Sequence, residues 1–172
     1  LILTVSALTL HKGERGAATR LLSAALFTGA FLEFAETMAM AASLDYLPWK
    51  RVATFLESAL PVQLFIFSLF YARKFSWGTS SIISRLLLLF SPILLFAGLF
   101  FAPAQFYYSP DFFTERMLFL NNLGFSFYIL VFIYLVAALF NLEATFRSAH
   151  RPEQWQIKFT ILGAGTLLGL LV

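Results

Sequence analysis

The sequence predicts an all-α protein, a polytopic bundle of transmembrane helices with four full spans and partial first and last helices. Hydrophobic residues make up 60% of the chain and charged residues only 12%, whereas soluble domains carry about 25% charged residues. The mean hydropathy is +0.82. The apolar residues also gather in long runs separated by short polar loops. We therefore expect lipid to cover much of the surface.

The apolar runs define the elements in order. Each complete run has about 20 residues or more, which at about 1.5 Å per residue crosses the roughly 30 Å hydrocarbon core of a bilayer. The runs show neither the period-2 alternation nor the length of barrel strands, about 10 residues. We predict the end of a first helix over Leu1–Leu10, full spans over Thr19–Ala42, Arg51–Ala72, Ile82–Pro103 and Arg116–Asn141, and the start of a sixth helix over Ile157–Val172.

Both ends of the sequence lie inside apolar runs that are too short to span a bilayer. We therefore expect residues 1–172 to form a single transmembrane sensory or anchoring domain that is a fragment of a longer chain.

The loops predict the orientation. Basic residues concentrate in alternate loops, and the positive-inside rule places those loops in the cytoplasm and the start of the first helix outside. Because these residues fall in separate short loops and form no stripe, nucleic-acid binding is not expected. The predicted cytoplasmic side holds Lys12, Arg15, Arg20, Arg73, Lys74, Arg85, Arg147, Arg151 and Lys158, and the opposite side holds Lys50, Arg51 and Arg116.

The predicted external loops are rich in aromatic residues and proline. Asp45–Trp49 and Gln105–Asp111 both show this composition. It is typical of the aromatic belts and turns at a membrane interface. A shallow ligand site is the alternative interpretation.

Three carboxylates lie within the predicted spans: Glu33, Glu36 and Glu57. Ionisable groups at membrane depth are costly and usually face a bundle interior or a cavity. Glu33 and Glu36 share one helix face, and Glu36 and Glu57 lie at similar distances from the loop that joins their helices. The three predict a sensory cluster in a polar pocket open to the outside. The alternative is that they are protonated or hydrogen-bonded packing residues.

Two prolines and two glycines bear on how the helices pack. Pro61 and Pro92 lie inside predicted helices and each removes a backbone hydrogen bond. They indicate either conformational hinges or static kinks. Gly165 and Gly169 have the spacing that permits close helix approach, within the chain or in a dimer.

Catalytic chemistry has little support in this sequence. The chain has no cysteine and two histidines, His11 and His150, which both fall in predicted loops without acid, base or ligand companions. We find no nucleophile–base pair, and we expect no catalytic residue, cofactor or metal in this segment.

Two patches of sequence resemble a known family. The first runs from Phe31–Glu36 to Leu60–Val62 and Phe67–Arg73, with a proline mid-helix before a Phe-rich stretch. It resembles the multi-helix membrane regions of bacterial sensor histidine kinases. The second, Asn141–Arg147 and then Gln154–Gly165, is similar to the PrsK family, the histidine kinases associated with the PEP-CTERM/exosortase system.

The resemblance implies a multi-pass protein of the bacterial inner membrane that senses a signal and acts as a homodimer. It also implies cytoplasmic kinase domains beyond this segment, which would use ATP and Mg²⁺ and pass phosphate to a cognate response regulator. We therefore expect a sensor or anchor region of a two-component kinase. The alternatives are a fragment of a secondary transporter or channel that uses the intramembrane carboxylates, and a scaffold without a ligand.

Overall fold

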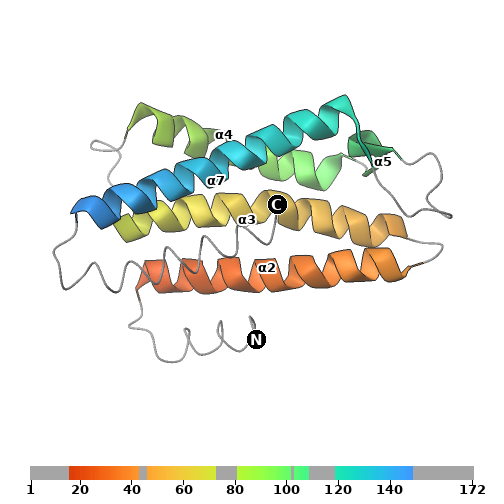
Figure 1. Cartoon of the computed structure of the whole chain (residues 1–172), viewed down its shortest axis with the longest axis horizontal. Coiled ribbons are helices and arrows are strands. Elements are labelled where there is room, and N and C mark those ends of the chain that lie inside the picture. Colours follow the sequence, from red (N-terminus) through yellow and green to blue (C-terminus); the bar gives the residue numbers. More distant parts are fainter. Residues whose placement is uncertain (1–15, 43–45, 73–80, 102, 109–118, 149–172) are drawn as a thin grey trace.

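The computed structural model describes residues 16–42, 46–72, 81–101, 103–108 and 119–148 (Figure 1). The predicted all-α bundle is confirmed for these residues. The predicted first and last partial helices lie outside them, and so do Gly165, Gly169 and both histidines. The elements are α2 (Ala17–Ala41), α3 (Tyr46–Ala72), α4 (Ile82–Phe100), α5 (Pro103–Phe106), β1 (Tyr107–Tyr108), β2 (Phe119–Leu120) and α7 (Asn122–Ser148).

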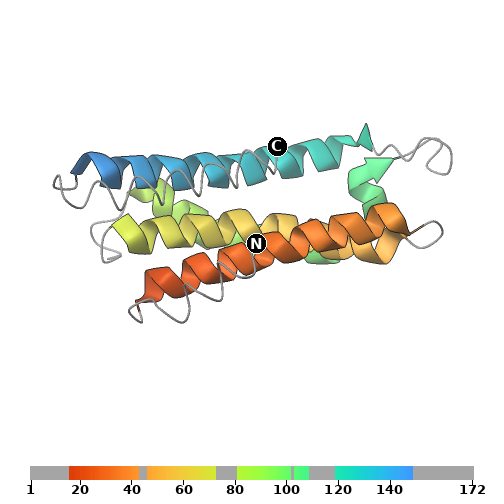
Figure 2. The same ribbon diagram turned by 60° about the horizontal axis from the view of Figure 1, so that its bottom comes forward.

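Helix α3 is the centre of the bundle. It packs against α2, α4 and α7, and α4 also packs against α7. Figures 1 and 2 show the long helices side by side, with α2 and α7 flanking α3. The chain direction reverses from each long helix to the next, so α2 is antiparallel to α3, whereas α3 and α7 run in the same direction. The end of α2, the start of α3 and residues 103–108, which follow α4, therefore lie at one end of the bundle.

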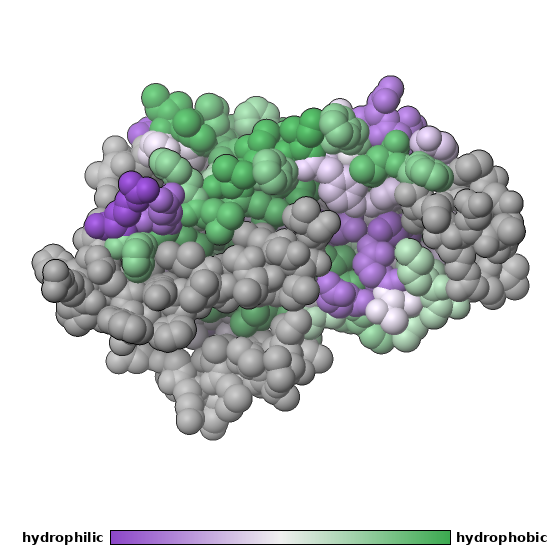
Figure 3. All heavy atoms as spheres, viewed as in Figure 1, coloured by the Kyte–Doolittle hydropathy of each residue, from purple (hydrophilic) through white to green (hydrophobic). Residues whose placement is uncertain are grey.

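Four helices, α2, α3, α4 and α7, are long and apolar enough to cross a membrane. Large apolar side chains cover the outer helices: Leu89 on α4 and Phe140 on α7 are both 69% exposed. Figure 3 shows such residues as a broad hydrophobic surface over the upper helices. An exposed apolar surface of this extent needs lipid as its solvent.

The helix bounds differ from the predicted spans mainly at α7 and α3. Helix α7 spans Asn122–Ser148, so it begins six residues and ends seven residues later than the predicted Arg116–Asn141. Helix α3 begins at Tyr46, five residues before the predicted start at Arg51, and thus includes most of the predicted Asp45–Trp49 loop. Pro48 does not prevent this start, because the first N–H groups of a helix have no partner within the helix. The shift places Lys50 on a helix instead of in a loop.

The segment after α4 contains strands that the spacing of the apolar runs did not predict. Residues Pro103–Phe106 form the short helix α5, and Tyr107 and Tyr108 pair antiparallel with Leu120 and Phe119. The backbone N–H of Asn121 donates to the Phe106 carbonyl, 2.8 Å away. These contacts fix the α5–β1 segment (103–108) against the start of α7.

Two glycines permit close approach at this end of the bundle. A Cβ on Gly98 of α4 would lie 3.0 Å from the Thr54 carbonyl oxygen of α3, and one on Gly124 of α7 would lie 3.1 Å from the Phe106 carbonyl carbon. Contacts this short with backbone atoms leave no room for a side chain. Gly98 therefore brings α4 onto α3, and Gly124 brings the α5–β1 segment onto α7.

Pro61 and Pro92 both lie inside helices that continue past them, α3 and α4 respectively. Pro61 is buried and Pro92 is exposed. Their role as hinges stays a prediction.

Candidate functional site: a buried ion-pair cluster

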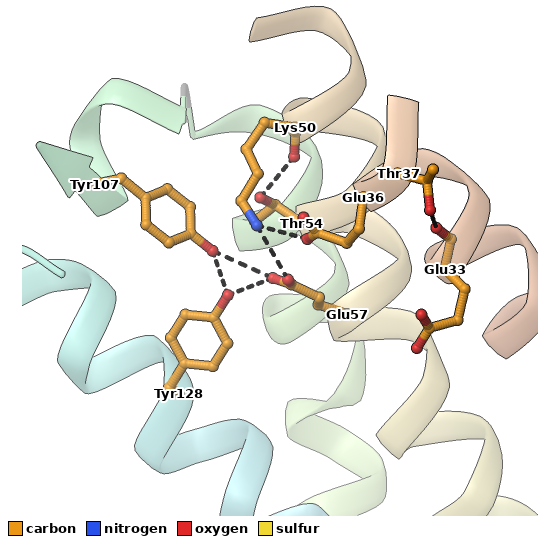
Figure 4. A network of polar contacts seen from close by, with 8 residues as sticks. All are labelled: Glu33, Glu36, Thr37, Lys50, Thr54, Glu57, Tyr107 and Tyr128. Carbon is orange, nitrogen blue, oxygen red and sulfur yellow. Dashed lines mark hydrogen bonds and ion pairs between the residues drawn. The ribbon is translucent and has the colours of Figure 1, made fainter. Parts of the chain in front are cut away.

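Lys50 is a buried cation in the bundle. The residue is only 7% exposed, and its Nζ donates to Glu36 Oε1 at 2.5 Å and to Glu57 Oε1 at 3.5 Å. Figure 4 shows the ammonium between the two carboxylates. The side chain of Glu57 is 16% exposed and that of Glu36 is 29% exposed. A lysine is almost never buried to this degree unless it is paired.

The helical repeat explains how these residues meet. Lys50 and Glu57 are seven residues apart on α3, which is close to two full turns and places both on one face. The antiparallel arrangement of α2 and α3 then brings Glu36, near the end of α2, beside Lys50, near the start of α3. The predicted convergence of Glu36 and Glu57 is thus found in the structure, with Lys50 between them.

Two tyrosines bind the other oxygen of Glu57. Tyr107 of β1 donates to Glu57 Oε2 at 3.3 Å, and Tyr128 of α7 donates to the same oxygen. The two hydroxyl groups also contact each other. Lys50 Nζ lies 4.8 Å from the centre of the Tyr107 ring, which is within cation–π range. Figure 4 shows both phenols directed at Glu57.

We call Glu36, Lys50, Glu57, Tyr107 and Tyr128 the ion-pair cluster. Its members come from α2, α3, β1 and α7, so one polar network joins three of the four long helices and the α5–β1 segment. Hydrogen bonds in a low-dielectric interior are electrostatically stronger than in water, and an unpaired polar group there is costly. The cluster therefore links α2, α3 and α7 through polar contacts.

Tyr107 lies outside the spanning helices, and its environment changes its acidity. Burial, followed by the negative charge of Glu57, raises the pKa of the Tyr107 phenol to about 12. Both causes disfavour the phenolate. Tyr107 therefore remains a neutral hydrogen-bond donor to Glu57 far above physiological pH.

We expect this pKa to be measurable by alkaline titration. The difference between the phenolate absorbance of the wild type and of Tyr107→Phe should rise near pH 12 and not near the ordinary tyrosine value of about 10. Because folding raises the pKa of Tyr107, neutral Tyr107 contributes to the stability of the folded protein. This contribution is fully present below the pKa of tyrosine in the unfolded chain and is lost as the pH rises through the pKa in the folded protein. A difference spectrum that titrates near pH 10 would show that Tyr107 is solvated.

Glu33 differs from the other two carboxylates. The residue is exposed, and no dashed line in Figure 4 reaches its carboxylate. Its backbone carbonyl accepts from Thr37 Oγ1 at 2.7 Å, but among the described residues the carboxylate has no hydrogen-bond or ion-pair partner. The structure therefore brings together Glu36 and Glu57 of the predicted cluster and leaves Glu33 outside the network.

A cavity of about 660 Å³ adjoins the cluster. It lies between α2, α3, β1, β2 and α7, and all three predicted carboxylates line it together with Lys50 and both tyrosines. Most of the remaining wall is apolar and includes Leu32, Leu60, Val131 and Leu135. A volume of this size and a largely apolar wall with a few convergent polar groups are typical of small-molecule sites. A cavity therefore adjoins the predicted carboxylates, but most of its wall is apolar, and its opening to the outside stays a prediction.

Within the part of the chain that the structure describes, no group of three or more His, Cys, Asp or Glu side chains is arranged to hold a metal ion. What the described cluster can do is change charge, exchange hydrogen bonds and bind a ligand in the adjoining cavity. Each of these would alter the contacts between α2, α3 and α7.

The prediction from sequence missed Lys50, Tyr107 and Tyr128. The sequence predicts Lys50 in an external loop and Tyr107 in an interfacial aromatic belt. The spacing of seven residues between Lys50 and Glu57 was a signal that could have paired them, once the helix was extended back to Tyr46. Tyr128 had no such signal, because it meets Glu57 across 71 residues of sequence.

The chain was also compared with known protein families, curated proteins and solved structures. No protein-family model matches the chain, and no curated protein or solved structure is significantly similar to it.

Proposed function

We propose that this chain is the membrane-embedded sensory region of a bacterial sensor histidine kinase, similar to the PrsK family of the PEP-CTERM/exosortase system. In this proposal the region sits in the inner membrane, with the start of its first helix outside. It passes its signal to cytoplasmic kinase domains that bind ATP and Mg²⁺, form a homodimer and phosphorylate a response regulator. The resemblance of the two sequence patches supports the kinase assignment.

The ion-pair cluster is the observation that carries the sensory role. It joins α2, α3 and α7 at one end of the bundle through charged hydrogen bonds. A stimulus that alters these bonds would favour a different packing of the helices, and two-state coupling of this kind requires such a difference in contacts between the states. Helix α7 would carry the change toward Arg147, at the predicted cytoplasmic end.

The transporter alternative has less support from the geometry. Many transporters build their substrate and ion sites from discontinuous helices at the membrane midplane. In the described residues, α2, α3, α4 and α7 each run without interruption, including α3 and α4 at their prolines. A scaffold without a ligand would have no need for a cavity lined by charged side chains, so the sensory role explains more of the structure.

Autophosphorylation of the intact protein in lipid tests the proposal. Glu57→Gln keeps the size of the side chain and removes its charge, while Glu36 continues to pair with Lys50. We expect basal phosphorylation with ATP and Mg²⁺ to change about 5-fold or more, because allosteric coupling energies are typically 1–3 kcal/mol. Glu143→Gln is the matched control, since Glu143 pairs with Arg147 on an exposed face of α7.

The possible results separate the two parts of the proposal. Absence of any phosphorylation in the intact wild-type protein would contradict the kinase assignment. Equal phosphorylation of the wild type, Glu57→Gln and Glu143→Gln would contradict the sensory role of the cluster. Thermal unfolding of each variant shows whether it is folded.

A further inference from the structure

The cavity beside the ion-pair cluster has an imbalance of charge. Three carboxylates, those of Glu33, Glu36 and Glu57, line it against the single ammonium of Lys50. When all are ionised, two negative charges have no counter-charge in the cavity wall. Uncompensated charge within a membrane span is costly and is usually paired. A cationic occupant would therefore be favoured by the field of the cavity.

Two of the carboxylates that line the cavity, those of Glu33 and Glu36, lie on α2. Lys50 binds Glu36 through Oε1 and Glu57 through its own Oε1, and the two tyrosines bind Glu57 Oε2. The Glu33 carboxylate has no partner among the described residues, and Glu33 lines the cavity next to Leu32. Glu33 and Glu36 are three residues apart on α2, hence on the same helix face. The two carboxylates could therefore both accept hydrogen bonds from one ammonium group of a ligand.

The charged groups of the site are mostly acceptors. The three carboxylates that line the cavity accept hydrogen bonds, whereas Lys50 and the two tyrosines are donors that are already bound within the cluster. This favours a ligand that carries N–H groups.

The remaining wall indicates the body of the ligand. A bare metal ion fits poorly, because the described carboxylates do not form a metal-binding group and the wall is largely apolar. Leu32, Leu60, Val131, Phe132 and Leu135 would contact an apolar chain or ring. Aromatic rings also attract ammonium groups, and Tyr107, Tyr128 and Phe132 all line the cavity.

We propose that the cavity binds a small organic amine with an apolar body. The ammonium group would bind Glu33 and Glu36 of α2, and the body would lie along the apolar wall formed by α2, α3 and α7. A second ammonium beside Glu36 would compete with Lys50, whose Nζ is already 3.5 Å from Glu57. Binding would thus weaken the ionic link between α2 and α3. The signalling consequence rests on the proposed sensory function, whereas binding itself does not.

Binding of octylammonium to the protein in phosphatidylcholine nanodiscs tests the inference by calorimetry, with octanol and octanoate as probes of equal chain length. We expect octylammonium to bind and the other two to bind at least about tenfold more weakly, as expected for losing hydrogen bonds to charged groups. Glu33→Gln should weaken octylammonium binding by a similar factor. This variant is expected to fold, because Glu33 is an exposed residue and its carboxylate has no partner among the described residues.

The control variant is Glu143→Gln, an exposed glutamate on α7 whose partner is Arg147. It should bind octylammonium as the wild type does. Equal binding by the wild type, Glu33→Gln and Glu143→Gln would show that the amine partitions into lipid, and would overturn the inference. Preferential binding of octanoate would also overturn it, since Lys50 would then be the ligand-binding charge.

Two further measurements identify the source of the amine and separate the proposed amine site from the proposed sensory function. Weaker octylammonium binding in nanodiscs that contain phosphatidylethanolamine would support an amine site filled by a lipid headgroup, and unchanged binding would support a free amine. Binding without any change in autophosphorylation would contradict the sensory function and leave the site intact. A responsive kinase that binds no octylammonium would overturn the site alone.

Discussion

Replacing Lys50 with methionine is expected to lower the free energy of unfolding by about 3–5 kcal/mol, which is the usual cost of removing one partner of a buried ion pair. Methionine has a similar length and can occupy the same space. The change leaves Glu36 and Glu57 near each other without the ammonium that lies between them. Their mutual repulsion is strong in an environment with a low dielectric constant. The expected loss therefore comes from charge and not from packing.

Reversible unfolding in mixed micelles of mild detergent and dodecyl sulfate, followed by circular dichroism, would measure this loss. Arg147→Met is the matched control, because Arg147 is 76% exposed and pairs with Glu143 one helical turn away. Such exposed pairs contribute about 0.3–0.5 kcal/mol. Adding Glu57→Gln to Lys50→Met should recover part of the loss, because it removes one of the two uncompensated charges. If Lys50→Met is no less stable than Arg147→Met, Lys50 does not stabilise the bundle.

The spans were predictable because a bilayer imposes a minimum length of apolar helix. Composition and run length therefore predict α2 and α4 within three residues, whereas α7 begins six residues and ends seven residues later than predicted. The predicted start of α3 at Arg51 is wrong, because the charge of Lys50 and the composition of Asp45–Trp49 indicate a loop where the helix already begins at Tyr46. A lysine can lie on a membrane helix when it has partners, and hydropathy alone does not show those partners.

This correction also bears on the predicted orientation. Lys50 lies in the bundle and binds two carboxylates, so it is not a loop charge. Arg20, Arg85 and Arg147, which the prediction counts on the cytoplasmic side, also lie on helices, and so does Arg51 on the opposite side. The orientation therefore stays a prediction.

The tyrosines of the cluster show a different limit. Tyr107 and Tyr128 reach Glu57 across 50 and 71 residues of sequence. Their positions depend on how the α5–β1 segment folds back onto α7, which neither periodicity nor hydropathy encodes. In contrast, Glu36 and Glu57 belong to helices adjacent in sequence, and the geometry of one helical hairpin was sufficient to predict their proximity.

Phe106→Ala is expected to have the second large effect, a loss of about 3–5 kcal/mol in the free energy of unfolding. Phe106 is 1% exposed, and its ring centre lies 4.8 Å from that of Phe127 and 5.7 Å from that of Phe101. Removing the ring would leave a void between the α5–β1 segment and α7. Loss of packing contacts destabilises even where lipid replaces water as the solvent, because an empty cavity has no atoms to contact.

The same substitution should affect the ion-pair cluster. Phe106 precedes Tyr107, so a loosened α5–β1 segment would let water reach the Tyr107 phenol. We expect its pKa to fall from about 12 toward the ordinary value for tyrosine. Both quantities can be measured on one sample, the first by unfolding in mixed micelles and the second by alkaline difference absorbance against the corresponding double variant with Tyr107→Phe.

Phe125→Ala is the matched control. Phe125 lies on α7, two residues before Phe127, the residue that Phe106 contacts, but its side chain is 61% exposed. It should change stability by about 0.5 kcal/mol or less and leave the Tyr107 pKa unchanged. If Phe106→Ala lowers stability but the Tyr107 pKa stays near 12, packing of Phe106 does not position the phenol. The β1–β2 pairing and the hydrogen bond from Asn121 to the Phe106 carbonyl would then be sufficient to hold Tyr107 against Glu57.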